Sequence, residues 1–212
     1  MIGGTGKLGY GLAKRFAAKG KQVVIGSRNE IKAKQKAKEI NVELFAQRVE
    51  GRTIHDAAKM GDIVFVTVPY KAQRETIEQI KKNVSGKIVV DTTVPLNPKN
   101  VTSQVNLPIS SAESASEILG KEDVHLVAGF HTISHTVLEN LEKSIDSDVL
   151  LCGNDDHSVE VVSSLVEELG ARPIHAGGLE QARVLERLTP MIIGMNKRYK
   201  KRHIGITMTG LE

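Results

Sequence analysis

Apolar and polar positions alternate between two patterns along the chain. Short continuous apolar runs are typical of buried strands, and they stand at Val23 to Ile25, Ile63 to Val68, Ile88 to Val90, His125 to Ala128 and Val149 to Leu151. Between them lie stretches in which apolar residues recur at helical spacing, as at Leu12, Ala13, Phe16 and Ala17. This regular alternation of strands and helices predicts a parallel α/β sheet.

The same pattern places the individual elements. Helices are expected over residues 7–19, 29–40, 55–60, 111–119, 158–169 and 179–199, with another from about residue 71. Strands are expected over residues 22–26, 42–49, 62–68, 87–91, 124–129, 148–153, 172–175 and 204–208. The stretch from Val94 to Pro108 breaks the alternation, and Pro190 should bend the last helix.

The chain opens with a glycine-rich turn, MIGGTGKLGYGLA. Gly4, Gly6 and Gly9 have the spacing that lets a turn and the start of a helix approach a dinucleotide pyrophosphate. Together with the alternation of elements, this turn predicts a doubly wound, Rossmann-type parallel sheet. We expect residues 1–140 to form the dinucleotide-binding region and residues 141–212 to form a smaller C-terminal lobe packed on it, or both to form one compact domain.

A central strand should precede such a turn, but only Met1 and Ile2 do so here. Omitting a central strand would leave a gap of about 10 Å between its neighbours, because strands lie about 4.8 Å apart. We therefore expect the first strand to be truncated and a handful of apolar residues to precede Met1 in the native protein. If Met1 is the true start, the protein should be poorly stable, or another segment must fill the central position.

The residue that recognises a ribose should end the next strand, about 20 positions after the turn. Gly26, Ser27 and Arg28 stand there, and Lys32 follows one helical turn later. A carboxylate at this place would select the free 2′-hydroxyl of NAD, whereas a hydroxyl and cations suit the 2′-phosphate of NADP. We therefore expect NADP(H) to be the cofactor. The alternative is a basic helix start without a binding role.

Composition places the chain among ordinary globular proteins and argues against several partners. Of its 212 residues, 40% are hydrophobic and 25% are charged, and it contains no apolar run of membrane-spanning length and no secretory signal pattern. We therefore expect a cytoplasmic protein without a membrane partner. Aromatic residues make up only 3% of the chain and tryptophan is absent, so we expect no base-stacking surface for nucleic acid.

The net charge of +4 comes from one segment near the C-terminus. Lys197, Arg198, Lys200, Lys201 and Arg202 supply five positive charges without an acid between them, and the rest of the chain is close to neutral. One interpretation is a solvated helix end, where cations complement the negative end of the helix dipole. The other is a cationic surface near a ligand site, which would attract an anionic ligand and speed its association.

Three features resemble reactive or metal sites but have simpler explanations. Cys152 has no partner for an intramolecular disulfide and stands at the end of a predicted strand, where small cysteines are usually packed. His131 and His135 have the spacing of two ligands on one helical face, but a strand should end at the first of them. Asp155 and Asp156 are suited to capping the helix that follows. We therefore expect no metal site.

Seven segments that span nearly the whole chain also resemble a known family. They are IGGTGKLGYGLA, VVIGSRNEIKA, DIVFVTVP, KIVVDTTVP, AGFHTIS, LLCGNDD and GGLEQARVLERLTPMI. In this order they resemble the NADPH-dependent reductases of coenzyme F-420, an 8-hydroxy-5-deazaflavin. The resemblance implies an oxidoreductase that transfers a hydride between NADP(H) and coenzyme F-420, and it implies a homodimer.

The resemblance also assigns site residues. It implies that NADP is held by Thr5, Gly6, Leu8, Ser27, Arg28 and Lys32. Val68 and Pro69 would line the nicotinamide side, and the loop His131-Thr132-Ile133-Ser134 would lie at the hydride-transfer site. Direct transfer requires stacked rings with donor and acceptor carbons about 3 to 3.5 Å apart, and it requires no acid/base pair. His131 would orient the deazaflavin or relay its proton, or it would be a hydrogen-bonded structural group.

Two other functions remain open at this point. The first is an NADPH-dependent reductase of another flavin or of a C=O or C=N substrate, and reduction of a carbonyl would depend on a proton donor. The second is a non-catalytic NADPH-binding regulator. The absorbance of the deazaflavin band, measured while NADPH is present, separates the three functions.

Overall fold

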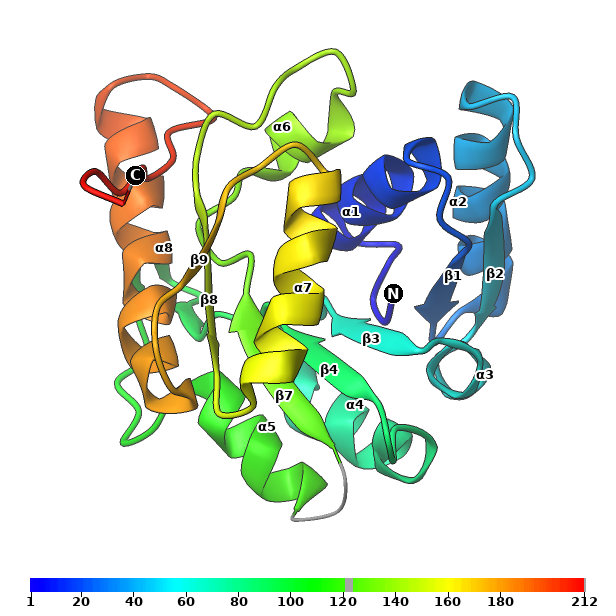
Figure 1. Cartoon of the computed structure of the whole chain (residues 1–212), viewed down its shortest axis with the longest axis horizontal. Coiled ribbons are helices and arrows are strands. Elements are labelled where there is room, and N and C mark those ends of the chain that lie inside the picture. Colours follow the sequence, from blue (N-terminus) through cyan, green and yellow to red (C-terminus); the bar gives the residue numbers. More distant parts are fainter. Residues whose placement is uncertain (121–123, 212) are drawn as a thin grey trace.

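The computed structural model describes residues 1–120 and 124–211. Its main sheet has the strand order β3 (Ile63–Val66), β4 (Ile88–Asp91), β7 (His125–Gly129), β8 (Val149–Gly153) and β9 (Pro173–His175). Two more strands, β1 (Val23–Ser27) and β2 (Val49–Thr53), pair in parallel and lie beyond β3 (Figure 1).

The first residues of the chain join these two groups of strands. Ile2 forms parallel bridges to Gly26 on β1 and to Val66 on β3. The amide of Gly3 donates to the carbonyl of Gly26 at 2.9 Å. Ile2 thus occupies the central position in which the glycine turn requires a strand. The expectation of further residues before Met1 stays a prediction.

Helices cover both faces of the sheet. They are α1 (Lys7–Ala18), α2 (Glu30–Glu43), α3 (Ile54–Met60), α4 (Tyr70–Ile80), α5 (Ser111–Leu119), α6 (His135–Glu139), α7 (Asp156–Glu168) and α8 (Ala182–Arg198), with short 3-10 helices at Lys81–Asn83 and Leu179–Gln181. One apolar core contains Phe16 of α1 and Val90 of β4, and the other contains Ile77 of α4 and Val89 of β4. Because successive side chains of a strand point to opposite faces, the two cores lie on opposite sides of the sheet. The predicted doubly wound α/β architecture is confirmed.

One strand runs against the predicted direction. β8 is antiparallel to β7, whereas the other paired strands of the sheet are parallel. A parallel return would need a crossover along a face of the sheet. Residues 130–148 stay instead at the end of the sheet where β7 finishes, because α6 is attached to α1 there. Arg15 Nη2 of α1 donates to the Val137 carbonyl of α6 at 2.6 Å.

The strand predicted over residues 42–49 is wrong. α2 continues to Glu43, and β2 begins only at Val49. The side chain of Asn41 causes this shift, because its oxygen accepts from the amides of Arg48 and Val49 while its nitrogen donates to the Val49 carbonyl. These bonds fold the intervening residues into a turn.

The strand predicted over residues 204–208 is also wrong, since the described residues after α8 form none. The amide of Asp148 donates to the Ile206 carbonyl at 2.8 Å, as in a ladder. The amide of Met208, however, donates to the Asp148 carboxylate at 2.6 Å. A side chain thus takes the place of the next backbone acceptor, and the ladder stops. Pro190 lies within α8, which is continuous through it.

The irregular stretch before α5 contains a hairpin that the pattern does not predict. Its strands are β5 (Leu96–Asn97) and β6 (Asn100–Gln104), and β6 packs on α8. A Cβ on Gly194 of α8 would lie 3.8 Å from Thr102 of β6, which is ordinary contact distance. The hairpin and α8 therefore form one side of the molecule next to the carboxyl end of β4.

The strands of the expected C-terminal lobe continue the main sheet. β8 pairs with β7 across residue 140, and β9 pairs with β8. The division of the chain at residue 140 stays a prediction. Among the helices of the described residues, none combines the length and the apolar character needed to cross a membrane.

Candidate functional site

The glycine turn links the central position of the sheet to α1. Gly3 has a φ of +82°, which favours glycine, and a Cβ there would lie 2.8 Å from Val68 Cγ1. A Cβ on Gly9 would lie 2.3 Å from the Thr67 hydroxyl oxygen, so glycine allows close packing. α1 begins after Gly6 without a side-chain cap and without an acid in its first turn. Its first amides and the positive end of its dipole are therefore available to an anion.

A cavity of about 200 Å³ lies beside this turn, and we call it the turn cavity. Its lining brings Thr5 and Gly6 together with Ser27, Arg28 and Lys32, which come from the end of β1 and the start of α2. The amide of Lys32 donates to the side chain that caps α2 at 3.0 Å, which fixes Lys32 in the first turn. Within the described residues, neither Arg28 nor Lys32 forms an ion pair. Both cations are therefore available to an anionic ligand.

A second cavity, of about 480 Å³, adjoins the first, and we call it the central cavity. Gly6, Thr67, Val68 and Pro69 line both cavities and so form their boundary. The whole loop of residues 131–134 borders the central cavity. Its apolar lining includes Leu8, Val94, Leu96, Phe130, Ile133, Ile192, Ile193 and Ile204. The arrangement suits an elongated ligand with an anionic end in the turn cavity and a flat, largely apolar group in the central cavity.

The loop of residues 131–134 leaves β7 through a strained residue. Phe130 has a φ of +66°, which residues other than glycine rarely adopt, and it is fully buried. Its ring lies edge-on to Phe65 with 5.7 Å between centroids, and Phe65 lies 5.4 Å from Phe16 of α1. This aromatic packing holds the strained backbone in place. The next residue, His131, therefore borders the central cavity instead of continuing the strand.

His131 is a buried side chain at the edge of the central cavity. It is 6% exposed, and within the described chain neither ring nitrogen makes a hydrogen bond of acceptable geometry. Its backbone carbonyl accepts from the Thr189 hydroxyl of α8 at 2.9 Å. Burial lowers the pKa of His131 to about 4, and the backbone of Thr93 opposes this lowering. The imidazole is therefore neutral at pH 7, with one donor and one acceptor nitrogen.

A buried carboxyl group shapes the neighbouring end of β4. Asp91 accepts from the amide of Thr93 at 3.1 Å and from its hydroxyl at 2.6 Å. The side-chain amide of Gln73 on α4 donates to the other carboxyl oxygen. Burial raises the pKa of Asp91 to about 6, and these hydrogen bonds oppose the rise. Thr92 and Thr93 line the central cavity but Asp91 does not, so Asp91 acts by fixing the turn.

Two cations of α1 anchor α6, which follows the loop. Arg15 is 6% exposed and donates to the backbone carbonyls of Val137, Leu138, Asn140 and Lys143 at distances of 2.6 to 3.1 Å. Lys14 Nζ donates to the Glu139 carbonyl at 2.8 Å. Carbonyls at the end of a helix lack partners within the helix, and here side chains of α1 supply them. The helix that begins at the glycine turn therefore also holds the loop at the central cavity.

The sequence pattern misses one wall of the central cavity. The residues of this wall are Thr189, Ile192, Ile193 and Asn196 of α8, with Arg202 and Ile204 after it. A signal for the helical part exists, because Thr189 and Asn196 stand seven positions apart and share a helical face with Ile192. Two polar residues on an apolar face mark a face that borders a ligand site.

Most of the predicted binding residues are brought together. Thr5, Gly6, Leu8, Ser27, Arg28, Lys32, Val68, Pro69, His131, Thr132, Ile133 and Ser134 all line one or both of the two cavities. Gly4 and Gly9 line neither. A Cβ on Gly4 would lie 3.0 Å from Ile25 Cγ2, so this glycine, like Gly9, permits close packing beneath the turn.

Cys152 and Asp155 lie outside the two cavities. Cys152 is buried, and burial raises the pKa of its thiol to about 12. Asp155 caps α7 as expected, accepting from the Ser158 amide at 2.8 Å. Among the described residues, no group of three or more His, Cys, Asp or Glu side chains is arranged to hold a metal ion.

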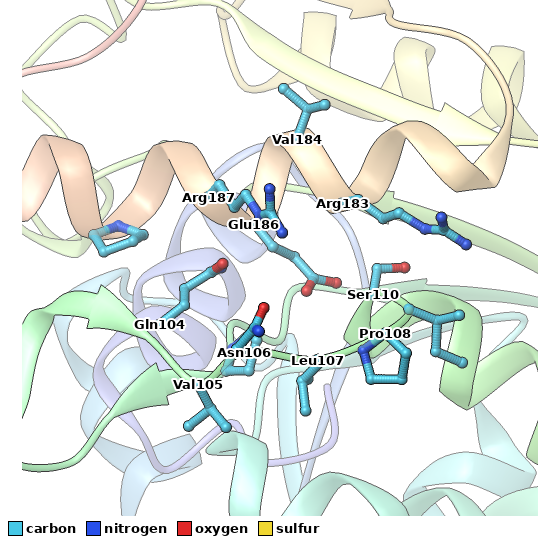
Figure 2. A pocket seen from close by; sticks show the side chains of 13 residues that line it. Gln104, Val105, Asn106, Leu107, Pro108, Ser110, Arg183, Val184, Glu186 and Arg187 are labelled. Atoms are coloured by element: carbon cyan, nitrogen blue, oxygen red, sulfur yellow. The ribbon is translucent and has the colours of Figure 1, made fainter.

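A further cavity, of about 570 Å³, lies between α8 and the segment before α5. Figure 2 shows the Glu186 side chain reaching from α8 toward Ser110. Its carboxyl oxygens accept from the amides of Ser111 at 3.0 Å and Ala112 at 3.1 Å, at the start of α5. Burial raises the pKa of Glu186 to about 8. This cavity shares no lining residue with the turn or central cavity, and its buried carboxyl group serves the end of α5.

Known proteins are similar to this chain in sequence and in architecture. Residues 1–95 match the family described as NADP oxidoreductase coenzyme F420-dependent. The chain is 38% identical to the F420-dependent NADP reductase of Methanocaldococcus jannaschii, over 100% of this chain and 98% of that relative. It is also 38% identical to the F420-dependent NADP reductase of Methanothermobacter thermautotrophicus, over 100% of this chain and 94% of that relative.

A solved structure shares the fold of this chain. A crystal structure assigned to an F420-dependent NADP reductase of an Arthrobacter species superposes with a TM-score of 0.83 and covers 96% of each chain. Its sequence identity is 21%, so this likeness concerns the fold alone. The similarity to the two archaeal enzymes over the full chain carries the assignment: the chain belongs to the F420-dependent NADP reductase family.

Proposed function

We propose that the turn cavity and the central cavity together hold NADP(H) and coenzyme F-420, with the two reacting rings in contact at the boundary residues Val68 and Pro69. As a member of its family, the protein is an oxidoreductase that uses these two substrates for hydride transfer. The observation that carries the proposal is the continuity of a cationic cavity with a larger apolar one.

The turn cavity suits the adenosine half of NADP(H). The open start of α1 and the backbone around Thr5 and Gly6 bind the pyrophosphate. Ser27, Arg28 and Lys32 bind the 2′-phosphate by charge-assisted hydrogen bonds. A carboxylate that would prefer the 2′-hydroxyl of NAD is absent from the described lining of this cavity.

The central cavity suits the nicotinamide and the deazaflavin. Leu8, Val68 and Pro69 line it beside the glycine turn, and Ile133 lines it from the loop after β7. Direct hydride transfer requires the two rings to be held face to face with reacting carbons about 3 to 3.5 Å apart. An apolar enclosure that excludes water favours this contact and prevents loss of the hydride to solvent.

His131 supplies the polar contact in this apolar enclosure. The residue lines the cavity, burial keeps its imidazole neutral at pH 7, and neither ring nitrogen makes a well-formed hydrogen bond within the described residues. A neutral imidazole can donate to a ring carbonyl or accept from a ring N–H without adding a charge. Because reduction of the deazaflavin by a hydride also takes up one proton, we assign to His131 one of two roles, orienting the ring or relaying this proton.

A homodimer and a cytoplasmic location form part of this proposal. Val184, Met191 and Met195 on α8 are 53%, 50% and 37% exposed, and their spacing forms one apolar stripe. An exposed apolar stripe supports a contact between subunits. We expect sedimentation at micromolar concentration to give a dimer, and a monomer under these conditions would contradict this part. Cell fractionation tests the location.

Anaerobic mixing of the purified protein with NADPH and oxidised coenzyme F-420 tests the function. We expect the absorbance band of the oxidised deazaflavin to disappear with one NADPH consumed per deazaflavin. Binding of NADPH without any loss of this band would indicate a regulator. Consumption of NADPH only with carbonyl, imine or other flavin substrates would indicate a different reductase, and either result would overturn the proposal.

A further inference from the structure

The chain reverses direction immediately after α8. Lys200 has a φ of +52°, in the left-handed region that glycine usually occupies at the end of a helix. The amide of Lys201 donates to the Asn196 carbonyl at 2.9 Å, and the amide of Lys200 donates to the Lys197 carbonyl at 3.4 Å. These two bonds are those of a Schellman turn. The turn carries the following residues back toward the central cavity.

The returning segment, residues 201–204, is fastened from two sides, and we call it the C-terminal strap. The carbonyl of Arg202 accepts from the Ser134 hydroxyl at 2.8 Å and from the Thr136 hydroxyl at 3.2 Å, at the start of α6. The amide of Ile204 donates to the Asn196 side chain of α8 at 3.2 Å. Arg202 and Ile204 consequently line the central cavity beside the loop that carries His131.

Arg202 brings a cation to this position. It is exposed, and within the described parts of the chain it forms no ion pair, nor do the other four cations of the C-terminal cluster. Arg28 and Lys32 already provide cations for the phosphate in the turn cavity. Arg202 therefore adds a cation, besides Lys7 on the glycine-turn side, to the lining of the central cavity, where NADP(H) presents its nicotinamide end.

Two more cations continue the same wall. Lys197 follows Ile193 by four positions on α8, which is the spacing of neighbours on one helical face, and Lys200 stands in the turn that ends this helix. Ile193 and Asn196 line the central cavity, whereas Lys197 and Lys200 do not. A ligand that leaves the cavity along this face would thus pass Arg202 first and then reach a surface of positive charge.

We propose that Arg202 binds an anionic group, a phosphate or a carboxylate, on the side chain of the deazaflavin substrate. This inference rests on the proposed function, because coenzyme F-420 carries a phosphodiester and an oligoglutamate tail on its ring system. A planar guanidinium forms paired, charge-assisted hydrogen bonds with either group. The strap fixes the backbone of Arg202, so this cation is held next to the ring site and the tail leaves over Lys197 and Lys200.

Three substrates and three variants test this assignment. The substrates are 8-hydroxy-5-deazariboflavin without phosphate, its 5′-phosphate, and coenzyme F-420 with its glutamates. The variants are Arg202→Gln, Arg202→Lys and the control Lys201→Gln, which removes a neighbouring cation that does not line the cavity. Thermal unfolding of each variant checks the fold, and KM is measured with saturating NADPH at low and high salt.

We expect Arg202→Gln to raise KM for coenzyme F-420 by about tenfold and to flatten its dependence on salt. KM for the uncharged deazariboflavin should rise by less than about twofold, Arg202→Lys should be intermediate, and Lys201→Gln should resemble the wild type. The full effect with the 5′-phosphate identifies the phosphate as the bound group. An effect only with coenzyme F-420 identifies the glutamate carboxylates.

Two results would overturn the assignment of Arg202. One is an equal rise in KM of Arg202→Gln for charged and uncharged deazaflavins. The other is an unchanged KM of Arg202→Gln for both kinds of substrate, provided that the wild type reduces both. Failure of the wild type to reduce any of the three deazaflavins with NADPH would instead overturn the proposed function. The uncharged substrate therefore separates failure of the site from failure of the enzyme.

Discussion

Burial of His131 should make the free energy of unfolding fall measurably as the pH is lowered. The side chain is 6% exposed, and burial lowers its pKa to about 4 from an ordinary value of 6.5. The unfolded chain therefore binds a proton at this residue between about pH 6.5 and pH 4, whereas the folded chain does not. By linkage, this residue makes the folded state less stable as the pH falls through that window.

The size of the effect follows from the two pKa values. Each unit of difference corresponds to about 1.4 kcal/mol, so the full shift is worth about 3 kcal/mol below pH 4. Between pH 7 and pH 5 the loss from His131 alone is about 2 kcal/mol, since only part of the window has been crossed. The loss is nearly absent above pH 6.5 and grows progressively as the pH falls to 4.

Urea unfolding at pH 7, 6 and 5 measures this loss for the wild type, for His131→Gln and for the control His175→Gln, which removes an exposed histidine. The free energy of unfolding of the wild type and of the control should fall more steeply with acid than that of His131→Gln, by about 2 kcal/mol over the range. Only the difference in slope is used, so a constant packing cost of the substitution does not matter. Equal slopes for all three proteins would refute the burial argument.

Three further substitutions test the cofactor preference and the packing around the glycine turn and α1. Arg28→Asp should lower the preference of kcat/KM for NADPH over NADH by about a hundredfold, because it replaces a cation of the turn cavity by an acid, and equal use of both cofactors by the wild type would contradict the assignment. Gly9→Ala should lower the free energy of unfolding by about 1 to 3 kcal/mol, because its Cβ would lie 2.3 Å from the Thr67 hydroxyl, and an unchanged urea midpoint would count against this. Arg15→Met should lower that free energy by about 3 kcal/mol or more through loss of its bonds to backbone carbonyls, and a smaller loss than for the exposed control Arg74→Met would disprove the anchor.

The elements that the sequence predicts well are those with a strong local signal. The helix after the glycine turn and the strand at Ile63–Val66 follow from periodicity and from a continuous apolar run. The strand predicted over residues 42–49 failed because one side chain, Asn41, redirects the backbone by three hydrogen bonds. Strand propensity describes each residue's own preference, so it does not predict a side chain that forms hydrogen bonds with the backbone several residues away.

The direction of β8 depends on a contact that is remote in sequence. Arg15 of α1 holds the carbonyls of α6 and so keeps the connection at one end of the sheet. In the same way, Asp148 accepts the Met208 amide and ends a ladder that the apolar pattern of the C-terminus favours. Both outcomes require knowledge of which distant segments meet, which periodicity does not contain.

The two cavities differ in how far they can be predicted. The turn cavity is built from a short motif and the end of the next strand, so Gly6, Ser27 and Arg28 are found from spacing alone, whereas Thr5 follows from the family resemblance. One wall of the central cavity comes from α8 and the C-terminal strap, which are far along the chain from the glycine turn. Its residues, such as Asn196, become part of the site only when the helix packs beside the loop after β7.

The most direct test of the account follows the hydride itself. NADPH carrying deuterium at the transferable position of its nicotinamide is mixed with one equivalent of oxidised coenzyme F-420 and the protein in ordinary water. If the central cavity holds the two rings in contact, each reduced deazaflavin gains one deuterium, and its mass rises accordingly. Reduced deazaflavin that instead carries hydrogen from solvent would contradict direct transfer and with it the ring arrangement proposed for this cavity.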